Sequence, residues 1–281
     1  MKLIKIGLIG LLILLIVYQT ATNLRTQKNR GNAPIISSDV DEIQIHCAYN
    51  TDDLLQGLTA YDAEDGYITD RILVGGFSDF TERGVSSLEY AVYDIDGNVA
   101  IFSRKVVFSD YSPPWVAMSA PWVFKPAYNA YSIPSLNLAG WDMLDGDISK
   151  RVLITSDDLN FSEPGKYTAT VCLKNSFGDE VNMDLPIHIL DPEQNGYTIE
   201  LSESLIYTEK GETIRPEQYI AAVRNEYTSE TIPADEYELT IHSYVDTSKD
   251  GIYEIQYSAV SYDMVQRGET WLTVVVGDYG G

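Results

Sequence analysis

The segment Leu58–Arg71, LTAYDAEDGYITDR, decides the fold, because a second copy follows 80 residues later as Leu138–Arg151, LAGWDMLDGDISKR. A leucine, an aspartate, an Asp-Gly pair, an isoleucine and an arginine recur in register between the two segments. Further along the chain the offset becomes 81, so that Gly97 matches Gly178. A match of this length indicates a repeated structural unit.

Each copy is followed by short β-rich runs with turn residues between them. Leu88–Tyr93 and Val99–Phe108 flank the turn DIDGN at 94–98, whose glycine accepts the positive φ that hairpin turns require. A weaker third unit has a similar pair of runs, Gly251–Ala259 and Glu269–Val276. Several short strands per unit predict an all-β chain built of β-sandwiches.

Prolines mark the junctions between the units, at Pro113-Pro114 and at Asp191-Pro192. A proline lacks the N–H that a sheet ladder needs, and its ring fixes φ and so stiffens the junction. We therefore predict an N-terminal segment at 1–31 and three domains at 32–112, 113–193 and 194–281.

The N-terminal segment is basic and apolar. It holds five basic residues and no acidic residue, and Ile6–Tyr18 is an uninterrupted apolar run. Such a run is typical either of a cleaved secretory signal or of an uncleaved anchor. The small-residue cleavage pattern is met only in part by Gln19–Asn23, so the sequence favours a single-pass anchor in the cytoplasmic membrane. The body of the chain is expected outside the cell.

The rest of the chain is strongly acidic. The whole chain has 19 basic and 42 acidic residues, of which 14 basic and all 42 acidic ones lie beyond residue 31. A surface of this charge repels phosphate backbones, so nucleic acid is excluded as a partner. Two cysteines and three histidines are too few for a typical zinc cluster. No nucleophile or nucleotide-binding motif is present, and the sequence therefore predicts no enzyme and no cofactor other than calcium.

The order of these features resembles a known family. The block Leu-x-Ala-x-Asp-x-x-Asp-Gly-x-Ile-Thr, followed by Asp-x-x-Gly-Asn, resembles the bacterial Ig-like domains found in tandem on Gram-positive surface proteins. Domains at the end of some pesticidal crystal proteins and hyalin-type repeats look similar. The first unit departs from the pattern at Gly84-Val85-Ser86, whereas the second keeps its Gly-x-Tyr as Gly165-Lys166-Tyr167. The resemblance covers about residues 34–276.

The resemblance implies three tandem Ig-like β-sandwiches after an N-terminal membrane helix. It also implies a non-enzymatic surface stalk, or an adhesion and interaction module, with a protein or a glycan as its partner. The alternative is a carbohydrate-binding module or an accessory to a cell-envelope enzyme. An exposed aromatic strip would favour the carbohydrate-binding alternative.

Two groups of residues are candidate sites. Acidic side chains in two loops of the first unit offer the hard oxygen ligands that Ca²⁺ takes, or else they build turns by accepting nearby backbone N–H bonds. Aromatic side chains in the second unit form either a binding platform or part of a core. Trp141 is interpreted as structural, since it lies where Tyr61 does in the first unit. The candidate calcium ligands are Asp62, Glu64, Asp65, Asp94, Asp96 and Asn98, and the candidate binding aromatics are Trp115, Trp122, Tyr128 and Tyr131.

Overall fold

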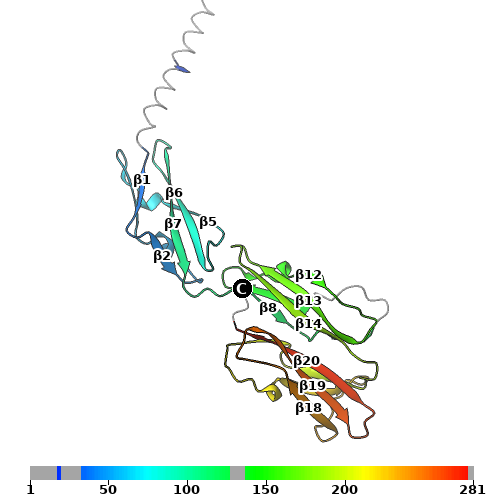
Figure 1. Cartoon of the computed structure of the whole chain (residues 1–281). Coiled ribbons are helices and arrows are strands. Elements are labelled where there is room, and N and C mark those ends of the chain that lie inside the picture. Colours follow the sequence, from blue (N-terminus) through cyan, green and yellow to red (C-terminus); the bar gives the residue numbers. More distant parts are fainter. Residues whose placement is uncertain (1–17, 20–32, 127–136, 278–281) are drawn as a thin grey trace, which may run out of the picture. The chain divides into compact units, whose positions relative to one another are not determined.

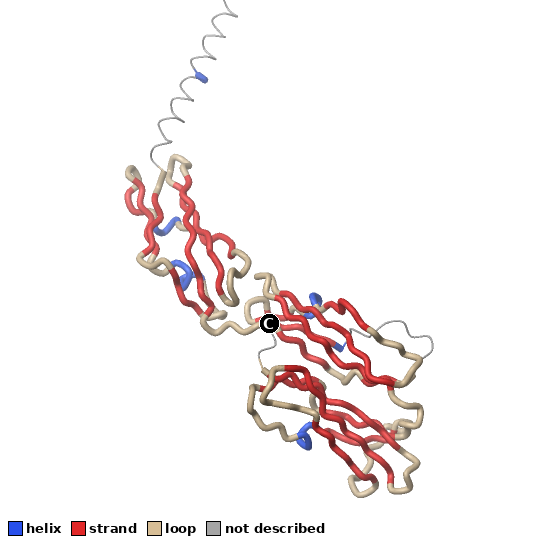
Figure 2. The backbone as a smooth tube through the Cα atoms, viewed as in Figure 1, coloured by secondary structure: helices blue, strands red, loops and turns tan. Residues whose placement is uncertain are grey.

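The computed structural model describes residues 18–19, 33–126 and 137–277. Over these residues the chain is built of β-strands with a few short helical segments, as Figures 1 and 2 show. This confirms the all-β prediction. Contacts between Cα atoms divide the chain into two compact units, Met1–Tyr111 and Ser112–Gly281.

The first unit contains two sheets, together called the first sandwich. A three-stranded sheet has the order β1-β3-β4, and a four-stranded sheet has the order β2-β7-β6-β5. The pairings are antiparallel except for β2 with β7, which is parallel. The strands are β1 (Ile35–Ser38), β2 (Glu42–Ile45), β3 (Leu58–Asp62), β4 (Gly66–Tyr67), β5 (Leu73–Phe77), β6 (Val85–Tyr93) and β7 (Val99–Phe108).

The core of the first sandwich follows from the alternation of side chains along its strands. Leu88, Tyr90 and Val92 of β6 are fully buried, while Glu89 and Tyr93 between and beside them are exposed. A strand places successive side chains on opposite faces, so one face of β6 packs inward and the other meets water.

A buried arginine completes this core. Arg104 of β7 is only 3% exposed, yet its guanidinium donates to the carbonyl oxygens of Leu54 at 2.6 Å and Gln56 at 2.7 Å. The Tyr90 hydroxyl also donates to the Leu54 carbonyl, at 2.7 Å. These bonds satisfy the buried charge and hold the end of the short helix α2 (Thr51–Leu55).

The second unit contains two further pairs of sheets. In the second sandwich, the sheet β11-β10-β8 pairs with the sheet β12-β13-β14-β9 around a core that includes Val116, Leu173 and Leu185. Its strands are β8 (Trp115–Met118), β9 (Val123–Phe124), β10 (Leu138–Asp142), β11 (Gly146–Asp147), β12 (Leu153–Asp157), β13 (Gly165–Lys174) and β14 (Glu180–Ile189).

The third sandwich combines the sheet β15-β17 with the sheet β16-β20-β19-β18 around a core that includes Ile255, Tyr257 and Leu272. Its strands are β15 (Tyr197–Leu201), β16 (Leu205–Thr208), β17 (Ile220–Asn225), β18 (Tyr237–Ser243), β19 (Gly251–Ser261) and β20 (Arg267–Val276). Single 3₁₀ turns lie at η1 (Thr69–Arg71), η3 (Ser149–Arg151) and η4 (Pro216–Tyr219). The division of the chain into three domains at 112/113 and 193/194 stays a proposal.

A buried polar cluster joins the second and third sandwiches. The Glu254 carboxylate on β19 contacts His188 Nε2 on β14 at 2.5 Å and Lys166 Nζ on β13 at 2.5 Å. Trp271 of β20 stacks on the His188 ring, with centroids 3.8 Å apart and planes 3° from parallel. Burial disfavours the carboxylate, but the bonds from His188 and Lys166 outweigh it and hold the pKa of Glu254 below its usual 4.5.

The apolar core crosses the same junction. Leu205 of β16 and Val275 of β20 are buried in the hydrophobic cluster of the second sandwich. Beside them, the Tyr207 hydroxyl bonds to both the N–H and the carbonyl oxygen of Val116, at 3.1 and 3.0 Å. The second and third sandwiches therefore share one continuous packed region.

The predicted membrane anchor is corrected. No helix within the described residues is long and apolar enough to cross a membrane. The helix α2 has five residues, which is about 7.5 Å of rise, against a hydrocarbon core of about 30 Å. The apolar run Ile6–Tyr18 lies outside the described residues, except for Tyr18. The assignment of a single-pass anchor with an external body is withdrawn.

Replacing Glu254 with Gln should destabilise the second unit by about 2–4 kcal/mol, because His188 and Lys166 lose a buried ionic partner. Since the folded-state pKa of Glu254 is lowered, its contribution is present above the unfolded pKa and is lost as the pH falls through the folded pKa. The wild type should therefore lose more stability than E254Q below about pH 4.5. Hydrogen exchange read separately over 112–277 measures both effects, and D250N, at the exposed Lys210–Asp250 ion pair, is the control. Equal acid sensitivity of the wild type and E254Q would contradict this role.

Candidate functional site

The first candidate acidic loop is closed by a buried aspartate. Asp62 ends β3, and its Oδ1 accepts the backbone N–H groups of Glu64 at 2.8 Å and Asp65 at 2.9 Å. Asp65 in turn accepts from the Ile95 N–H at 2.9 Å and from Arg71 Nη1 at 2.8 Å. The loop is therefore tied both to its own backbone and to the hairpin between β6 and β7.

The second sandwich repeats these four hydrogen bonds. Asp142 Oδ1 accepts the N–H groups of Leu144 at 2.9 Å and Asp145 at 3.0 Å. Asp145 Oδ2 accepts from the Ser176 N–H at 2.7 Å and from Arg151 Nη1 at 2.6 Å. The equivalence of the two loops, inferred from the repeat, therefore extends to individual atoms.

The second candidate acidic loop is the hairpin turn after β6. Asp94 Oδ1 accepts the Asn98 N–H at 2.8 Å, and Asp94 Oδ2 accepts from Asn98 Nδ2 at 2.7 Å. Burial opposes ionisation of Asp94, but its bonds with Asn98 and with neighbouring backbone N–H groups outweigh this and lower its pKa. Asp96 and Glu64 are exposed beside the two loops.

Calcium at these loops stays a prediction. Within the part of the chain that the structure describes, no group of three or more acidic, histidine or cysteine side chains is arranged to hold a metal ion. Asp62, Asp65 and Asp94 all accept backbone N–H groups, as the turn-building alternative requires.

The candidate aromatics separate into three groups. Trp115 is 37% exposed on the outer face of β8, directly opposite Trp141 of β10, which is 42% exposed. Trp122 is 2% exposed and its Nε1 donates to Asn137 Oδ1 at 2.9 Å, so it belongs to the core. Tyr128 and Tyr131 lie outside the described residues. Trp141 is interpreted as structural from the sequence because it lies where Tyr61 does in the first unit, and the structure exposes both side chains on the outer face of their strands.

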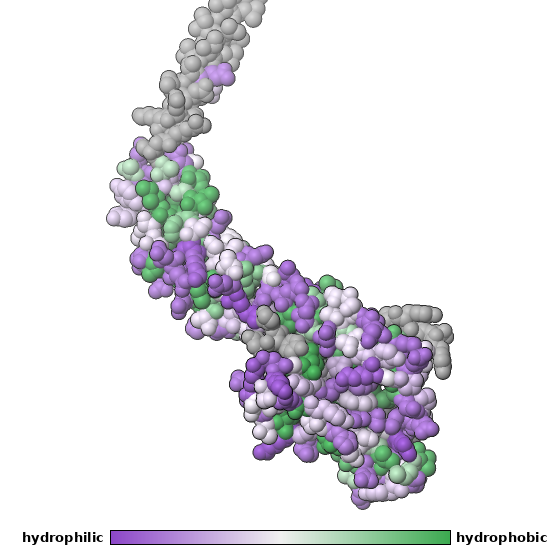
Figure 3. Space-filling view, in the orientation of Figure 1, coloured by the Kyte–Doolittle hydropathy of each residue, from purple (hydrophilic) through white to green (hydrophobic). Residues whose placement is uncertain are grey.

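The first sandwich exposes an apolar surface that no sequence motif indicated. On the outer side of the four-stranded sheet, Ala91 lies between Leu73 and Ile101, and Tyr93 lies opposite Val99. Leu73, Tyr93, Val99 and Ile101 are between 47% and 71% exposed. Figure 3 shows hydrophobic side chains gathered over this part of the first unit. The term apolar sheet face is used for Leu73, Ala91, Tyr93, Val99 and Ile101.

The equivalent positions of the second sandwich are mostly polar. Cys172 lies between Leu153 and Asn182, and Lys174 lies opposite Glu180. The same strands in the same register therefore carry a charged pair where the first sandwich carries Tyr93 and Val99. The fold does not require the apolar sheet face, and a large exposed apolar patch usually marks a binding surface.

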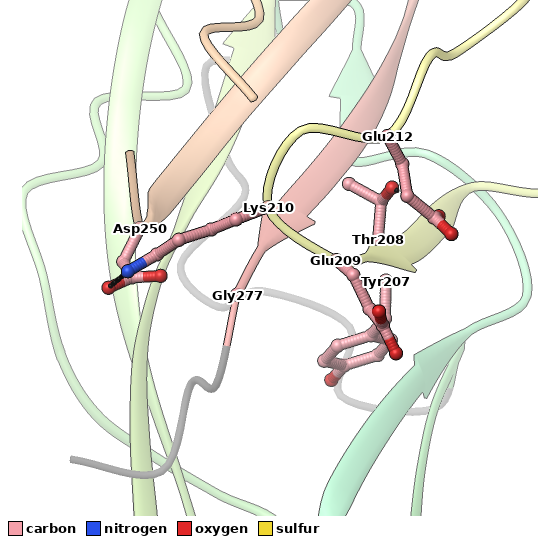
Figure 4. Close-up of a pocket in the computed structure, with 7 residues that line it drawn as sticks. All are labelled: Tyr207, Thr208, Glu209, Lys210, Glu212, Asp250 and Gly277. Carbon is pink, nitrogen blue, oxygen red and sulfur yellow. Dashed lines mark hydrogen bonds and ion pairs between the residues drawn. The ribbon is translucent and has the colours of Figure 1, made fainter. Parts of the chain in front are cut away.

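A pocket of about 620 Å³ lies beside β16 in the third sandwich, as Figure 4 shows. Lys210 crosses it to pair with Asp250 at 2.6 Å, while Thr208 bonds to Glu212 at 3.1 Å. Its carboxylates Glu209, Glu212 and Asp250 are all exposed to solvent. The described lining therefore holds no buried acid of the kind that acid–base catalysis uses.

Comparison with known sequences gives one weak similarity. No protein-family model matches the chain. The chain is similar to the pesticidal crystal protein Cry22Aa of Bacillus thuringiensis, with 26% identity over 153 residues. The match covers 53% of this chain but only 21% of that protein, about a fifth of its length. The resemblance to pesticidal crystal proteins is confirmed at this level, and the resemblance to Gram-positive surface proteins stays a prediction.

Comparison with solved structures gives distant similarities. The extracellular domain of protocadherin GammaB4 has 15% identity and a TM-score of 0.20, covering 88% of this chain and 49% of its own. A structure from Clostridium perfringens ZmpB, containing CBM51-2 with GlcNAc and INT domains, has 14% identity and a TM-score of 0.23. It covers 86% of this chain and 41% of its own. At these TM-scores, neither similarity supports an inference about this chain.

Replacing Gly66 with Val should destabilise the first unit by about 1–3 kcal/mol, because Gly66 has a φ of 76° that a β-branched residue strains to adopt. Gly146, with a φ of 71°, should behave in the same way in the second unit. Both added side chains would meet open space, so the cost is one of backbone conformation alone. Urea unfolding measures it. Gly76→Val is the control, since Gly76 also faces open space but lacks a positive φ, and a cost equal to that of G66V would refute the argument.

Proposed function

We propose that the chain is a non-enzymatic interaction module that binds a protein partner through the apolar sheet face of its first sandwich. The observation that carries the proposal is the row of apolar side chains at Leu73, Ala91 and Ile101, extended by Tyr93 and Val99. Their exposure leaves apolar surface in contact with water. A partner that buries this surface would gain about 25 cal/mol of binding free energy per Å².

The internal repeat supports a role in binding rather than in folding. Lys174 and Glu180 stand in the second sandwich where Tyr93 and Val99 stand in the first, and the second sandwich keeps the same hairpin register. Tyrosine, present here as Tyr93, is also enriched at binding hot spots. The acidic body around the face would favour a partner with a complementary basic rim.

Glycan binding is the second candidate function, and a different surface favours it. Trp115 and Trp141 lie opposite each other on adjacent strands, and both rings are more than one third exposed. Aromatic faces stack on the apolar faces of sugar rings, and two neighbouring rings offer a platform for one or two residues of a glycan.

The triple variant Y93K/V99E/I101N places the residues of the second sandwich onto the first. It should weaken binding of the protein partner by at least about tenfold, because several hot-spot positions become polar. Unfolding should change little, since all three side chains are exposed. Affinity purification from the source cells with the wild type and the variant identifies the partner that only the wild type retains. Titration with the purified partner then gives both affinities, and equal affinities would reject the proposed surface.

Trp115→Ala and Trp141→Ala test the glycan-binding candidate. Each should lower affinity for the bound glycan by about tenfold, because each removes one stacking ring. A glycan array identifies the ligand, and titration followed by tryptophan fluorescence measures its affinity. Tyr67→Ala, at an 81% exposed tyrosine of the first unit, is the control and should leave binding unchanged. No bound glycan on the array, or equal loss with Y67A, would remove this candidate.

A further inference from the structure

One oxygen of Asp62 is left without a partner inside the first sandwich. Asp62 is 3% exposed, and its Oδ1 accepts two backbone N–H groups. Its Oδ2 is buried and has no hydrogen-bond partner among the described residues. A buried carboxylate oxygen without a donor costs folding free energy, so a ligand that binds this oxygen would stabilise the first sandwich.

The second sandwich shows what stands at this point when the carboxylate is satisfied. There Asn175 Nδ2 donates to Asp142 Oδ2 at 3.0 Å, while Asn175 Oδ1 accepts the Asp179 N–H at 2.9 Å. The residue equivalent to Asn175 in the first sandwich is Asp94, at the repeat offset of 81. A carboxylate cannot donate, so Asp94 cannot replace that bond.

The two sandwiches have exchanged an acid and an amide. The first carries Asp94 and Asn98, and the second carries Asn175 and Asp179 at the matching positions. Asp94 is 8% exposed, and its oxygens bond to Asn98. The exchange puts a second buried carboxylate, Asp94, at the position equivalent to Asn175, the residue that donates to Asp142 in the second sandwich. Within the described residues, neither acid has a lysine or arginine partner.

The nearby arginine does not offset the charge of Asp62 or Asp94, because Arg71 pairs with Asp65. Asp65 is itself occupied by Arg71 and by the Ile95 N–H. In the second sandwich the corresponding Asp145 is occupied by Arg151 in the same way. The first sandwich therefore has a buried carboxylate at Asp94 where the second has the Asn175 amide, and this carboxylate is held by hydrogen bonds from Asn98 rather than by a cationic side chain.

We propose that a divalent cation of the calcium class binds between Asp62 Oδ2 and the Asp94 carboxylate. Two carboxylates balance its charge, and hard oxygen ligands suit such ions. The Asn98 amide contacts Asp94 Oδ2 at 2.7 Å, and its oxygen and nitrogen exchange places by a simple rotation, which makes its oxygen available as a third ligand. With so few protein ligands, affinity falls in the weak class, about 10⁻⁴–10⁻³ M.

The site differs from the broader set of acids in the same loops. It uses two carboxylates and one amide. The described residues hold no metal-binding group of three or more acidic, histidine or cysteine side chains, and this site does not require one. Asp65, Glu64 and Asp96 are not ligands in this proposal. The second sandwich, which has the donor at Asn175, should bind no cation at the equivalent point.

The experiment compares the full-length chain with a variant that carries the arrangement of the second sandwich, D94N/N98D. Calcium at ten times its dissociation constant should slow hydrogen exchange through unfolding of residues 33–111 about tenfold in the wild type. The variant should show no such protection, because an amide at position 94 donates to Asp62 Oδ2. Isothermal titration with calcium alone gives the stoichiometry, expected to be one ion.

The reciprocal variant is the matched control. N175D/D179N installs the arrangement of the first sandwich in the second, and it should create calcium protection over the second unit. If D94N/N98D does not fold, D62N takes its place, since its Oδ1 keeps both backbone N–H bonds and its amide removes the charge.

Three results would overturn the proposal. The first is that hydrogen exchange over 33–111 of the wild type does not change with calcium or magnesium. The ion would be added at 20 times the largest dissociation constant expected of such sites, about 10⁻³ M. The second is protection on acidification without any response to cations, which would mean that a shared proton takes the place of the ion. The third is calcium protection that persists in both D94N/N98D and D62N, which would place the ion elsewhere.

Discussion

A buried aspartate that accepts two N–H groups of its own loop is the constraint on which both repeated sandwiches depend. Asp62 and Asp142 each end a strand and close the turn that follows, and charge-assisted bonds of this kind are stronger than neutral ones. The closed turn requires a positive φ at Gly66 and Gly146. It also aims the next aspartate at the hairpin of the facing sheet, so one local bond links the two sheets of each sandwich.

This constraint acts on the backbone and the interior, and it leaves the outer faces free to differ. The strands that carry Tyr93 and Val99 in the first sandwich carry Lys174 and Glu180 in the second, in the same register. Inside, the change is equally local: Arg104 satisfies carbonyl oxygens at the end of α2, whereas Leu185 fills the equivalent place with apolar volume. Because the fold tolerates these exchanges, function must be argued from each surface rather than from the fold.

The repeat predicted strands and turns well because it reports backbone requirements, which leave a local signature such as Asp-Gly. Burial of single aromatics was harder to predict. Trp122 is buried in the apolar core, and Asn137, fifteen residues away, accepts its N–H; no local pattern encodes these contacts. Trp141 is exposed because strand alternation places it beside Trp115 on the outer face. The junction of His188 with Glu254 joins residues 66 positions apart, and neither lies in a motif.

That junction also separates the sequence repeat from the unit that packs together. The boundary proposed at 193/194 divides the repeats, yet Leu205 and Val275 lie beyond it and are buried in the core around Val116. Removing the third sandwich would uncover that core and leave Lys166 and His188 without Glu254. Apolar area and ionic partners are thus lost together, and both losses disfavour a second sandwich on its own. Residues 112–281 therefore form one compact unit because the second and third sandwiches share an interior, although the sequence repeat separates them.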